Sequence, residues 1–343
     1  MKVAIVGLPQ AGKRTLFTLL TGREVPASRK PEEAVEGVAA VRDVRVDELA
    51  RLCRPEKTVY AENRFVLAPD MPYNEHGRGW LEAVRKCDLV CLVVRAFVSD
   101  AVYHPAGSVN AERDRTYLQG ELLLADMEIV DKRLQRIEKE KRAGLRPDQK
   151  VEESALRKCM TTLEGGRPAS EAPLEEHEAA SLRSLELVSL LPVLCVFNVS
   201  ESDLKSDFGP RSLAVSCQIE SEIMAMEDPA ERSGFLQAAG LESSGLDRVN
   251  AAVYDALGLM SFYTQGSDEC RAWTIRKGDT APVAGGKIHR DIQKGFIRVE
   301  VIRFEDFVAA GTEEKARELG KIQTRGKDYV LQDGDICHFL HNA

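Results

Sequence analysis

Short apolar runs alternate with amphipathic stretches along the first hundred residues. Continuously apolar runs occupy Val3–Val6, Phe65–Leu67 and Leu89–Val94. Between them lie segments with helical spacing, at Leu16–Leu20 and Val46–Leu52. Strands that are apolar on both faces and alternate with helices are typical of a parallel sheet covered on both sides. The pattern therefore predicts an α/β fold with a mainly parallel sheet.

The hydrophobic period changes from about Asn110, where apolar side chains recur at alternating spacings of four and three. These positions are Leu123, Met127, Val130, Leu134 and Ile137. The spacing predicts a coiled-coil-like helix, followed by a second helix over 151–163 and a third from 173 towards 191. Because the stripe lasts little more than two heptads, packing between these helices is favoured over dimerisation. Together they predict a helical arm.

Beyond the arm, apolar runs at Val193–Phe197 and Leu213–Val215 predict that the sheet resumes. The last eighty residues contain three short segments separated by turn signals, TAPVAGGKIH, GFIRVEVIRF and YVLQDGDICHF, which are interpreted as strands of a small β-rich domain. The predicted limits are 1–109 and 192–262 for the α/β domain, 110–191 for the arm and 263–343 for the terminal domain.

Composition narrows the class of protein. The 343 residues carry a net charge of −8 with a pI near 5.5, which argues against coating nucleic acid through bulk charge. The eight cysteines form no CxxC pair and read as buried side chains in a reducing compartment. No signal peptide and no apolar run of roughly 18 residues is present. We expect a soluble, cytoplasmic monomer that does not contact a membrane.

The strongest motif follows the first strand, where Gly7–Lys13 forms the body of a GxxxxGK[ST] phosphate-binding loop. Its glycines let backbone N–H groups surround phosphate oxygens, the helix N-terminus favours negative charge, and the lysine neutralises the outer phosphates. The alternative is an ordinary strand-turn-helix unit. The candidate nucleotide-binding residues here are Pro9, Gln10, Ala11, Gly12, Lys13, Arg14 and Thr15.

Two other strands end in polar segments, Asn198–Glu201 and Ser216–Cys217. Ligands bind beyond the carboxyl ends of strands in open α/β sheets, so both segments are candidates for the same site.

Several blocks, in the same order along nearly the whole chain, resemble the Obg-like ATPases, also called the YchF family, within the P-loop GTPases related to translation factors. They are KVAIVGLPQAGKRTLF, VVRAF, FNVSES, IESEI, RAWTIRKGDTAP, KGFIRVEVI and GKDYVLQDGDICHF. The resemblance implies a P-loop NTPase domain, a helical-hairpin arm and a carboxyl-terminal TGS domain of β-grasp type. It also implies nucleotide binding and association with the ribosome, or with RNA, through the TGS domain and the arm.

The resemblance assigns roles at the base site. Asn198 would contact the base, Val199 would lie against it, and Glu201, in place of a guanine-reading aspartate, goes with acceptance of ATP, often in preference to GTP. Phe97 matches an aromatic residue beside the adenine. The alternatives are that Asn198 caps a turn and that Phe97 belongs to the core.

Two further matches concern the edges of the site. Ser216 and Cys217 fall in the family's last base-binding loop. His104 matches a histidine in a loop implicated in hydrolysis, and its alternative is a solvated loop residue.

Three departures from the family pattern affect the Mg²⁺ site. Arg14 replaces the P-loop serine, the segment 28–32 lacks the switch threonine, and the strand that should end VDIAGL reads Val66–Met71. Because these groups hold Mg²⁺ against the phosphates, no metal ligand is predicted and hydrolysis is placed in doubt. Asp70, three residues late, could substitute only in a reshaped loop. The competing readings are an active ATPase or GTPase, a degenerate non-hydrolysing ribosome- or protein-binding module and, more distantly, a metabolite kinase.

Basic side chains gather in the terminal domain, where they could form a local patch facing RNA. They are Lys287, Arg290, Lys294, Arg298 and Arg303. The alternative is a solvated strand face, since alternation along a strand scatters such charges.

Overall fold

The computed structural model describes residues 1–26, 28, 30, 32–74, 77–141, 144–241 and 243–342. Residues 29 and 31 of the predicted switch-loop segment lie outside this part of the chain. The chain forms two compact units, the first comprising Met1–Gly37 and Arg64–Val249 and the second Val38–Asn63 and Asn250–Ala343. This division differs from the predicted limits, because the second unit takes residues 38–63 and 250–262, which were expected in the α/β domain.

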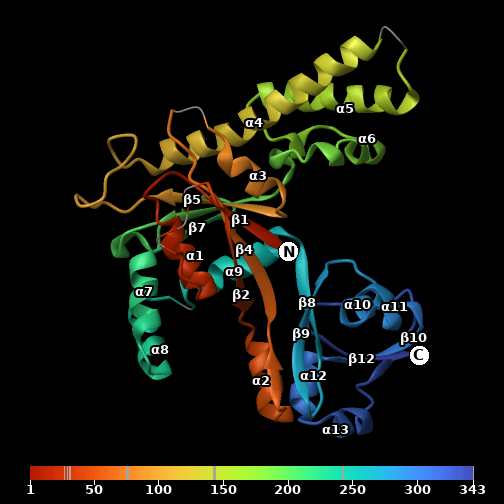
Figure 1. The fold of residues 1–343 in the computed structure, drawn as a ribbon. Coiled ribbons are helices and arrows are strands. Elements are labelled where there is room, and N and C mark those ends of the chain that lie inside the picture. Colours follow the sequence, from red (N-terminus) through yellow and green to blue (C-terminus); the bar gives the residue numbers. More distant parts are fainter. Residues whose placement is uncertain are drawn as a thin grey trace. The chain divides into compact units, whose positions relative to one another are not determined.

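The first sheet has six strands, and Figure 1 shows its core strand β1 flanked by β4 and β5. In order they are β2 (Val35–Val41), β4 (Ala61–Leu67), β1 (Lys2–Val6), β5 (Leu89–Arg95), β6 (Val193–Asn198) and β7 (Ser212–Val215). From β4 to β7 every neighbouring pair is parallel. The predicted mainly parallel sheet is confirmed, and the carboxyl ends of β1, β5, β6 and β7 meet at one edge.

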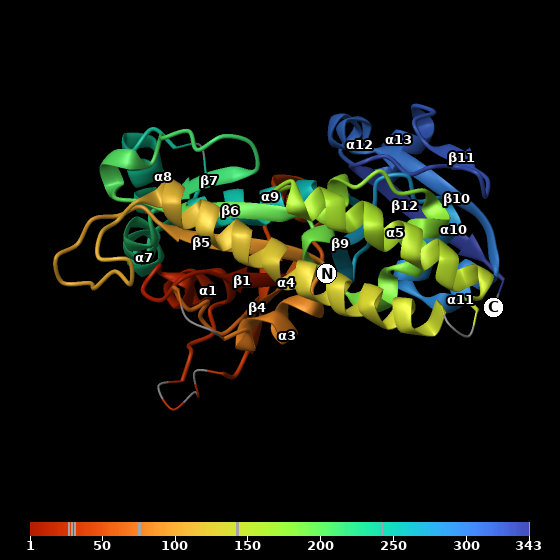
Figure 2. The same ribbon diagram turned by 90° about the horizontal axis from the view of Figure 1, so that it is seen from above.

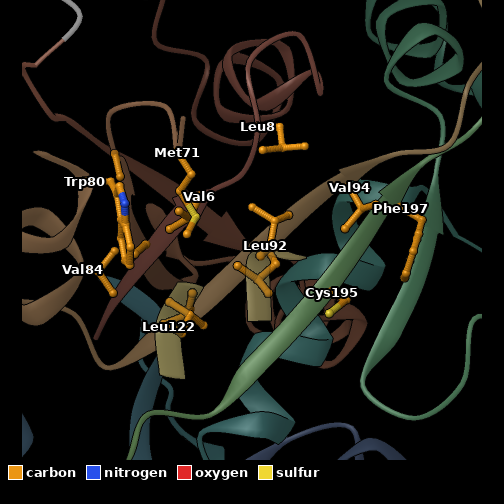
Figure 3. Packing of buried hydrophobic residues seen from close by; sticks show 14 of the residues in the cluster. Val6, Leu8, Met71, Trp80, Val84, Leu92, Val94, Leu122, Cys195 and Phe197 are labelled. Carbon is orange, nitrogen blue, oxygen red and sulfur yellow. The ribbon is translucent and has the colours of Figure 1, made fainter. Parts of the chain in front are cut away.

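Helices cover both faces of this sheet, with α3 and α4 on one side and α1 and α7 on the other (Figure 1). The helices of the first unit are α1 (Lys13–Thr21), α3 (Gly79–Arg85), α4 (Ala111–Glu140), α5 (Pro147–Glu164), α6 (Glu176–Ser181), α7 (Cys217–Ala225), α8 (Pro229–Ala238) and α9 (Gly245–Ala256), the last of which continues into the second unit. Trp80 of α3 packs beside Met71 and Val84, and Leu122 of α4 reaches Leu92 of β5 (Figure 3). Burial of these side chains fixes α3 and α4 on the sheet.

The arm is a hairpin in which α4 and α5 lie side by side (Figures 1 and 2). The predicted stripe on α4, including Val130 and Ile137, packs with Leu156, Cys159 and Leu163 of α5. The prediction of packing between arm helices is confirmed.

The prediction of one helix from 173 to 191 is wrong. Only α6 is α-helical there, and the rest forms short 3-10 turns η2 (Ala169–Glu171), η3 (Arg183–Leu185) and η4 (Val188–Leu190). Two features interrupt the helix: Glu186 has a left-handed backbone, with φ at +49°, and the buried Asp126 carboxylate accepts the N–H groups of Val188 and Ser189 at 2.9 and 2.7 Å. A side chain from α4 therefore satisfies backbone donors that a continuous helix would have paired.

The second unit contains a separate mixed sheet. In order its strands are β11 (Gln323–Arg325), β10 (Phe296–Arg303), β12 (Asp335–His341), β8 (Leu259–Thr264), β9 (Glu269–Arg276) and β3 (Lys57–Val59). Its helices are α2 (Val44–Cys53), α10 (Ala281–Ile288), α11 (Arg290–Lys294), α12 (Phe304–Ala310) and α13 (Glu313–Glu318). Strands β10 and β12 confirm two of the three segments predicted as strands.

The segment TAPVAGGKIH is α10, so its prediction as a strand is wrong. Thr280 stands at the N-cap position and Pro282 in the first turn, where the missing proline N–H costs nothing. Gly285 permits close packing, because a Cβ there would lie 2.6 Å from Ile292 Cγ2.

None of the described helices is long and apolar enough to span a bilayer.

Candidate functional site

The loop Gly7–Lys13 connects β1 to α1 as the motif predicts. Pro9 and Gln10 form its turn, and Gln10 and Gly12 adopt left-handed backbone conformations with φ of +61° and +94°. Gly12 is required for a second reason, since a Cβ there would lie 2.2 Å from Asn198 Nδ2. The loop therefore ends in a sharp turn pressed against β6, and α1 begins directly at Lys13.

Lys13 is the charged centre of the site, although only 4% of it is exposed. Its ammonium donates to the Leu8 carbonyl and lies 2.9 Å from Asp70 Oδ1. Asp70 itself is half-exposed, at 51% for its side chain. A carboxylate thus faces the lysine at a helix N-terminus, which is the environment expected for an anionic ligand.

Asn198 joins three of the predicted segments. Its amide Nδ2 donates to the Ala11 carbonyl at 3.1 Å, and its Oδ1 accepts from the Cys217 N–H at 3.1 Å. The side chain is 5% exposed. These bonds hold the phosphate-binding loop, the end of β6 and the start of α7 in one arrangement.

Phe97 follows the end of β5 and is tied to the same strand edge. The N–H groups of Ala96 and Phe97 both donate to the Asn198 carbonyl, at 2.9 Å each. Its ring lies 4.5 Å from the guanidinium carbon of Arg95. Phe97 is half-buried, so its ring is neither part of the hydrophobic core nor fully exposed to solvent.

His104 is buried against the start of α4, unlike a solvated loop residue. Its Nδ1 accepts from the Ala106 N–H at 3.1 Å and its Nε2 lies 2.9 Å from Asp114 Oδ2. Nδ1 is engaged within the loop and Nε2 faces Asp114 of α4, so use of His104 in hydrolysis would require this arrangement to change. That role stays a prediction.

The remaining base-site candidates differ in exposure. Val199 is 2% exposed and belongs to the hydrophobic core, whereas Glu201 begins η5 (Glu201–Asp203) and is exposed. Ser216 caps α7 by accepting the Ile219 N–H. Burial raises the pKa of the Cys217 thiol to about 12, so the thiol is neutral at physiological pH. The structure therefore brings Ala11, Gly12, Asn198 and Cys217 into direct contact, with Phe97 beside them.

Arg14 and Thr15 lie in the first turn of α1, and both are exposed. They line a cavity of about 390 Å³ that also borders Ser221 of α7. Arg14 therefore lies on an open surface hollow at the N-terminal end of α1.

The family model YchF-GTPase_C, described as "Protein of unknown function (DUF933)", matches residues 259–342. The chain is 36% identical to the "Ribosome-binding ATPase YchF" of Escherichia coli O157:H7 over 362 residues, covering 100% of this chain and 99% of that protein. It is also 36% identical to the protein of the same name from Bacillus subtilis, with 100% of both covered. The chain belongs to the YchF family.

A solved structure agrees with this membership. The Schizosaccharomyces pombe YchF GTPase superposes on the chain with a TM-score of 0.82 at 30% identity, covering 99% of this chain and 97% of that one. The α/β fold with its P-loop is therefore the fold of the YchF family, and the resemblance stated from the motifs is confirmed.

This YchF chain does not offer a fitting Mg²⁺ site. P-loop NTPases hold the ion with a loop hydroxyl and a strand-end aspartate. Here the loop residue is Arg14, the strand-end residue Leu67 is 1% exposed, and Asp70 pairs with Lys13. Within the described part of the chain, no group of three or more His, Cys, Asp or Glu side chains could hold a metal ion. The residues present do not fit the ion.

Arg95 was missed as a site residue by the sequence analysis. It is 3% exposed and its guanidinium donates to three main-chain carbonyls of the loop that carries Phe97. A charged residue ending the apolar run LVCLVVR was the available signal, because arginine is almost never buried without partners. Asp114, the partner of His104, carried no such signal, since it lies on a helix with many charges.

Proposed function

We propose that this chain binds a purine nucleotide, ATP or GTP, at the carboxyl edge of the first sheet and associates with the ribosome. The observation that carries the proposal is the buried Lys13 ammonium, held at the N-terminus of α1 with an acidic group 2.9 Å away. A phosphate group would take the place of the Asp70 carboxylate. The names of the relatives, ribosome-binding ATPases, support both parts of the proposal.

The parts of the ligand are assigned to separate elements. Backbone N–H groups of the loop Gly7–Lys13 and the first turn of α1 would hold the phosphates, and Lys13 would neutralise their charge. Phe97 and the segment Asn198–Glu201 would take the base. We propose that ATP is preferred, because Glu201 replaces the aspartate that reads guanine. Markedly tighter GTP binding in a calorimetric comparison would overturn this preference.

We further propose that hydrolysis is very slow. Arg14 places a permanent positive charge where a metal-holding hydroxyl is expected, and a guanidinium can pair with phosphate oxygens in a bidentate manner. It does not orient the β- and γ-phosphates for in-line attack as octahedral coordination does. Binding should therefore be less affected than turnover, because turnover needs interactions that strengthen in the transition state.

The first prediction concerns metal dependence. Titration of the protein with ATP, once with Mg²⁺ and once with a chelator, should give affinities within about threefold of each other, which is under 1 kcal/mol. A phosphate-release assay should show turnover far below the usual range. Strongly metal-dependent binding together with brisk phosphate release would contradict the proposal and restore an active ATPase or GTPase.

The second candidate function is a module that binds the ribosome or a protein and no nucleotide. The ion pair between Lys13 and Asp70 favours it, since the lysine already has an anionic partner. The same titration separates the two candidates. Absence of ATP and GTP binding, with ribosome co-sedimentation retained, would select the module.

Three of the predicted basic residues lie close in sequence on two short helices of the second unit. Lys287 belongs to α10, Arg290 and Lys294 belong to α11, and all three are exposed. We call them the helix patch. Arg298 and Arg303 lie on β10, and Arg303 is paired with Asp335 at 3.0 Å. We propose that the helix patch contacts ribosomal RNA.

The second prediction concerns reversal of the charge of the helix patch. The variant with Lys287, Arg290 and Lys294 all changed to Glu should co-sediment with ribosomes at least about tenfold more weakly, because lysine and arginine contacts to phosphates dominate such affinity. The salt dependence of the remaining binding should also fall.

A matched control carries the same change in charge elsewhere in the second unit. Its substitutions are Arg276→Glu, Lys277→Glu and Lys315→Glu, all at exposed positions. If the control weakens co-sedimentation as much as the helix-patch variant does, bulk charge rather than a local contact is responsible.

A further inference from the structure

Arg95 is the last residue of β5 and is almost fully buried, yet its hydrogen bonds with described residues go only to main-chain carbonyls. Its Nε donates to Phe97 O at 3.3 Å, Nη2 to Ser99 O at 3.3 Å and Nη1 to Tyr103 O at 3.0 Å. Desolvation by burial lowers its pKa. The Asp114 carboxylate opposes this shift from nearby, but it pairs with Arg113 and faces His104, so the guanidinium itself is held by main-chain carbonyls. Arginine is rarely buried on main-chain acceptors of this kind, which suggests a specific role.

Between Val98 and Tyr103 the loop around this guanidinium is a surface segment, and His104, buried against Asp114, follows it. Val98 and Tyr103 are 77% and 74% exposed, so their side chains contribute little to holding it. Arg95 reaches carbonyls at three points between residues 97 and 103, and its planar fork fits several acceptors at once. The conformation of residues 97–103 therefore depends largely on the Arg95 side chain.

Phe97 is fixed by the same guanidinium. One face of its ring meets Arg95 at 4.5 Å, within the range of a cation–π contact. Its backbone N–H is bonded to the Asn198 carbonyl at 2.9 Å, and Asn198 is bonded to the phosphate-binding loop. An aromatic ring has two faces, and Arg95 occupies one of them.

We infer that Arg95 is a positioning residue for the base site: it holds Phe97 so that the second ring face stacks on the purine of the nucleotide. This inference rests on the proposed nucleotide binding. It adds to that proposal the residue that determines how much the purine base contributes to the affinity for the nucleotide. Arg95 itself touches neither base nor phosphate.

The test compares ATP with inorganic tripolyphosphate, which carries the phosphates without a base. Arg95→Met should lower ATP affinity about tenfold, as expected for loss of one stacking contact, and leave tripolyphosphate affinity unchanged. Arg95→Lys keeps the charge but not the planar fork, so it should share most of the loss. Phe97→Ala should lower ATP affinity similarly, and the double variant Arg95→Met/Phe97→Ala should lose little more than either single one.

Arg115 provides the matched control. It also lies over a phenylalanine, 5.9 Å from the Phe197 ring centroid, and donates to a main-chain carbonyl, Phe208 O, at 3.0 Å. Arg115→Met should leave the affinity for both ligands unchanged. Thermal unfolding of each variant shows whether the fold is kept, and Arg95→Lys serves if Arg95→Met does not fold.

Three results of these titrations would overturn the role inferred for Arg95. ATP affinity unchanged in both Arg95 variants would overturn the inference, as would an equal loss for ATP and tripolyphosphate. Additive losses in the double variant would overturn it too. A wild-type protein that binds neither ligand would refute the proposed nucleotide binding itself, and the inference with it, whereas a wild type that binds both leaves only the role of Arg95 in question.

Discussion

A Lys13→Ala variant is expected to bind ATP about 100-fold more weakly than the wild type, a loss of about 2.7 kcal/mol. The ammonium is buried beside the loop, with 3% of its side chain exposed, so water can do little to replace it. Asp70→Asn should have the opposite effect and raise ATP affinity about three- to tenfold, because it removes a carboxylate that competes with the phosphates for Lys13. Isothermal titration calorimetry measures both changes.

Asp100→Asn, at an exposed position on the loop after β5, is the matched control for the change in charge and should alter ATP affinity little. The decisive contrast is the opposite sign of the effects at Lys13 and Asp70. If Asp70→Asn weakens ATP binding, and only when Mg²⁺ is present, Asp70 is a substitute metal ligand and the competition account is wrong.

An Asp43→Ala variant is expected to destabilise the second unit by about 3 kcal/mol. Asp43 caps α2 by accepting the Arg45 N–H at 3.0 Å, pairs with the Arg45 guanidinium at 3.0 Å and accepts the Tyr263 hydroxyl. Its side chain is only 14% exposed, so the variant leaves the Arg45 and Tyr263 groups without this partner. Arg45 keeps its ion pair with Asp333 at 2.7 Å, which limits the loss.

The Asp43 carboxylate should also make the stability of the second unit depend on pH. Burial alone would raise the pKa of Asp43, but hydrogen bonds from Arg45 and Tyr263 outweigh it and the pKa is lowered. A carboxyl group whose pKa is lower in the folded state stabilises the fold above its unfolded pKa, which is about 4. That contribution is lost as the pH falls through the lower folded pKa. The stability difference between wild type and Asp43→Ala should therefore shrink below about pH 4.

The two tryptophans allow this measurement, because Trp80 lies in the first unit and Trp273 in the second. Urea unfolding followed by Trp273 fluorescence, in a shared Trp80→Phe background, reports the second unit. Glu48→Ala is the control, since it breaks an exposed ion pair with Arg51 on the same helix and should have a much smaller effect. Equal effects of the two substitutions would contradict the structural role given to Asp43.

Local chemistry made much of the fold predictable. The turn before Lys13 needs residues that tolerate a left-handed backbone, and the apolar runs such as Leu89–Val94 are buried on both faces, so strand, loop and helix could be placed from sequence. The strands β10 and β12 could be predicted because turn signals separate these short segments. In contrast, the same turn signals led to the wrong prediction of a strand at α10. Its two glycines are explained by packing, since a Cβ at Gly285 would meet Ile292 and one at Gly286 would meet Gln293.

Other features depend on partners distant in the chain. No local pattern predicts that Asp126 replaces helical hydrogen bonds at Val188 and Ser189, 62 and 63 residues away. At the candidate site, the residue types of the loop and of Asn198 were predictable. The links through which Asn198 joins Ala11 to Cys217 were not, since they span 187 and 19 residues.

The division of the chain has a consequence for synthesis. The second unit is built from Val38–Asn63 and Asn250–Ala343, and Val46, Leu49 and Ala61 share a hydrophobic cluster with Tyr263 and Cys270. About 200 residues separate Ala61 from Cys270, which a ribosome needs about 10–40 s to translate at 5–20 residues per second. During that interval these early apolar side chains lack the partners that residues 250–343 contribute to the cluster. Nascent chains paused between residues 63 and 250 should therefore be the ones most in need of chaperones.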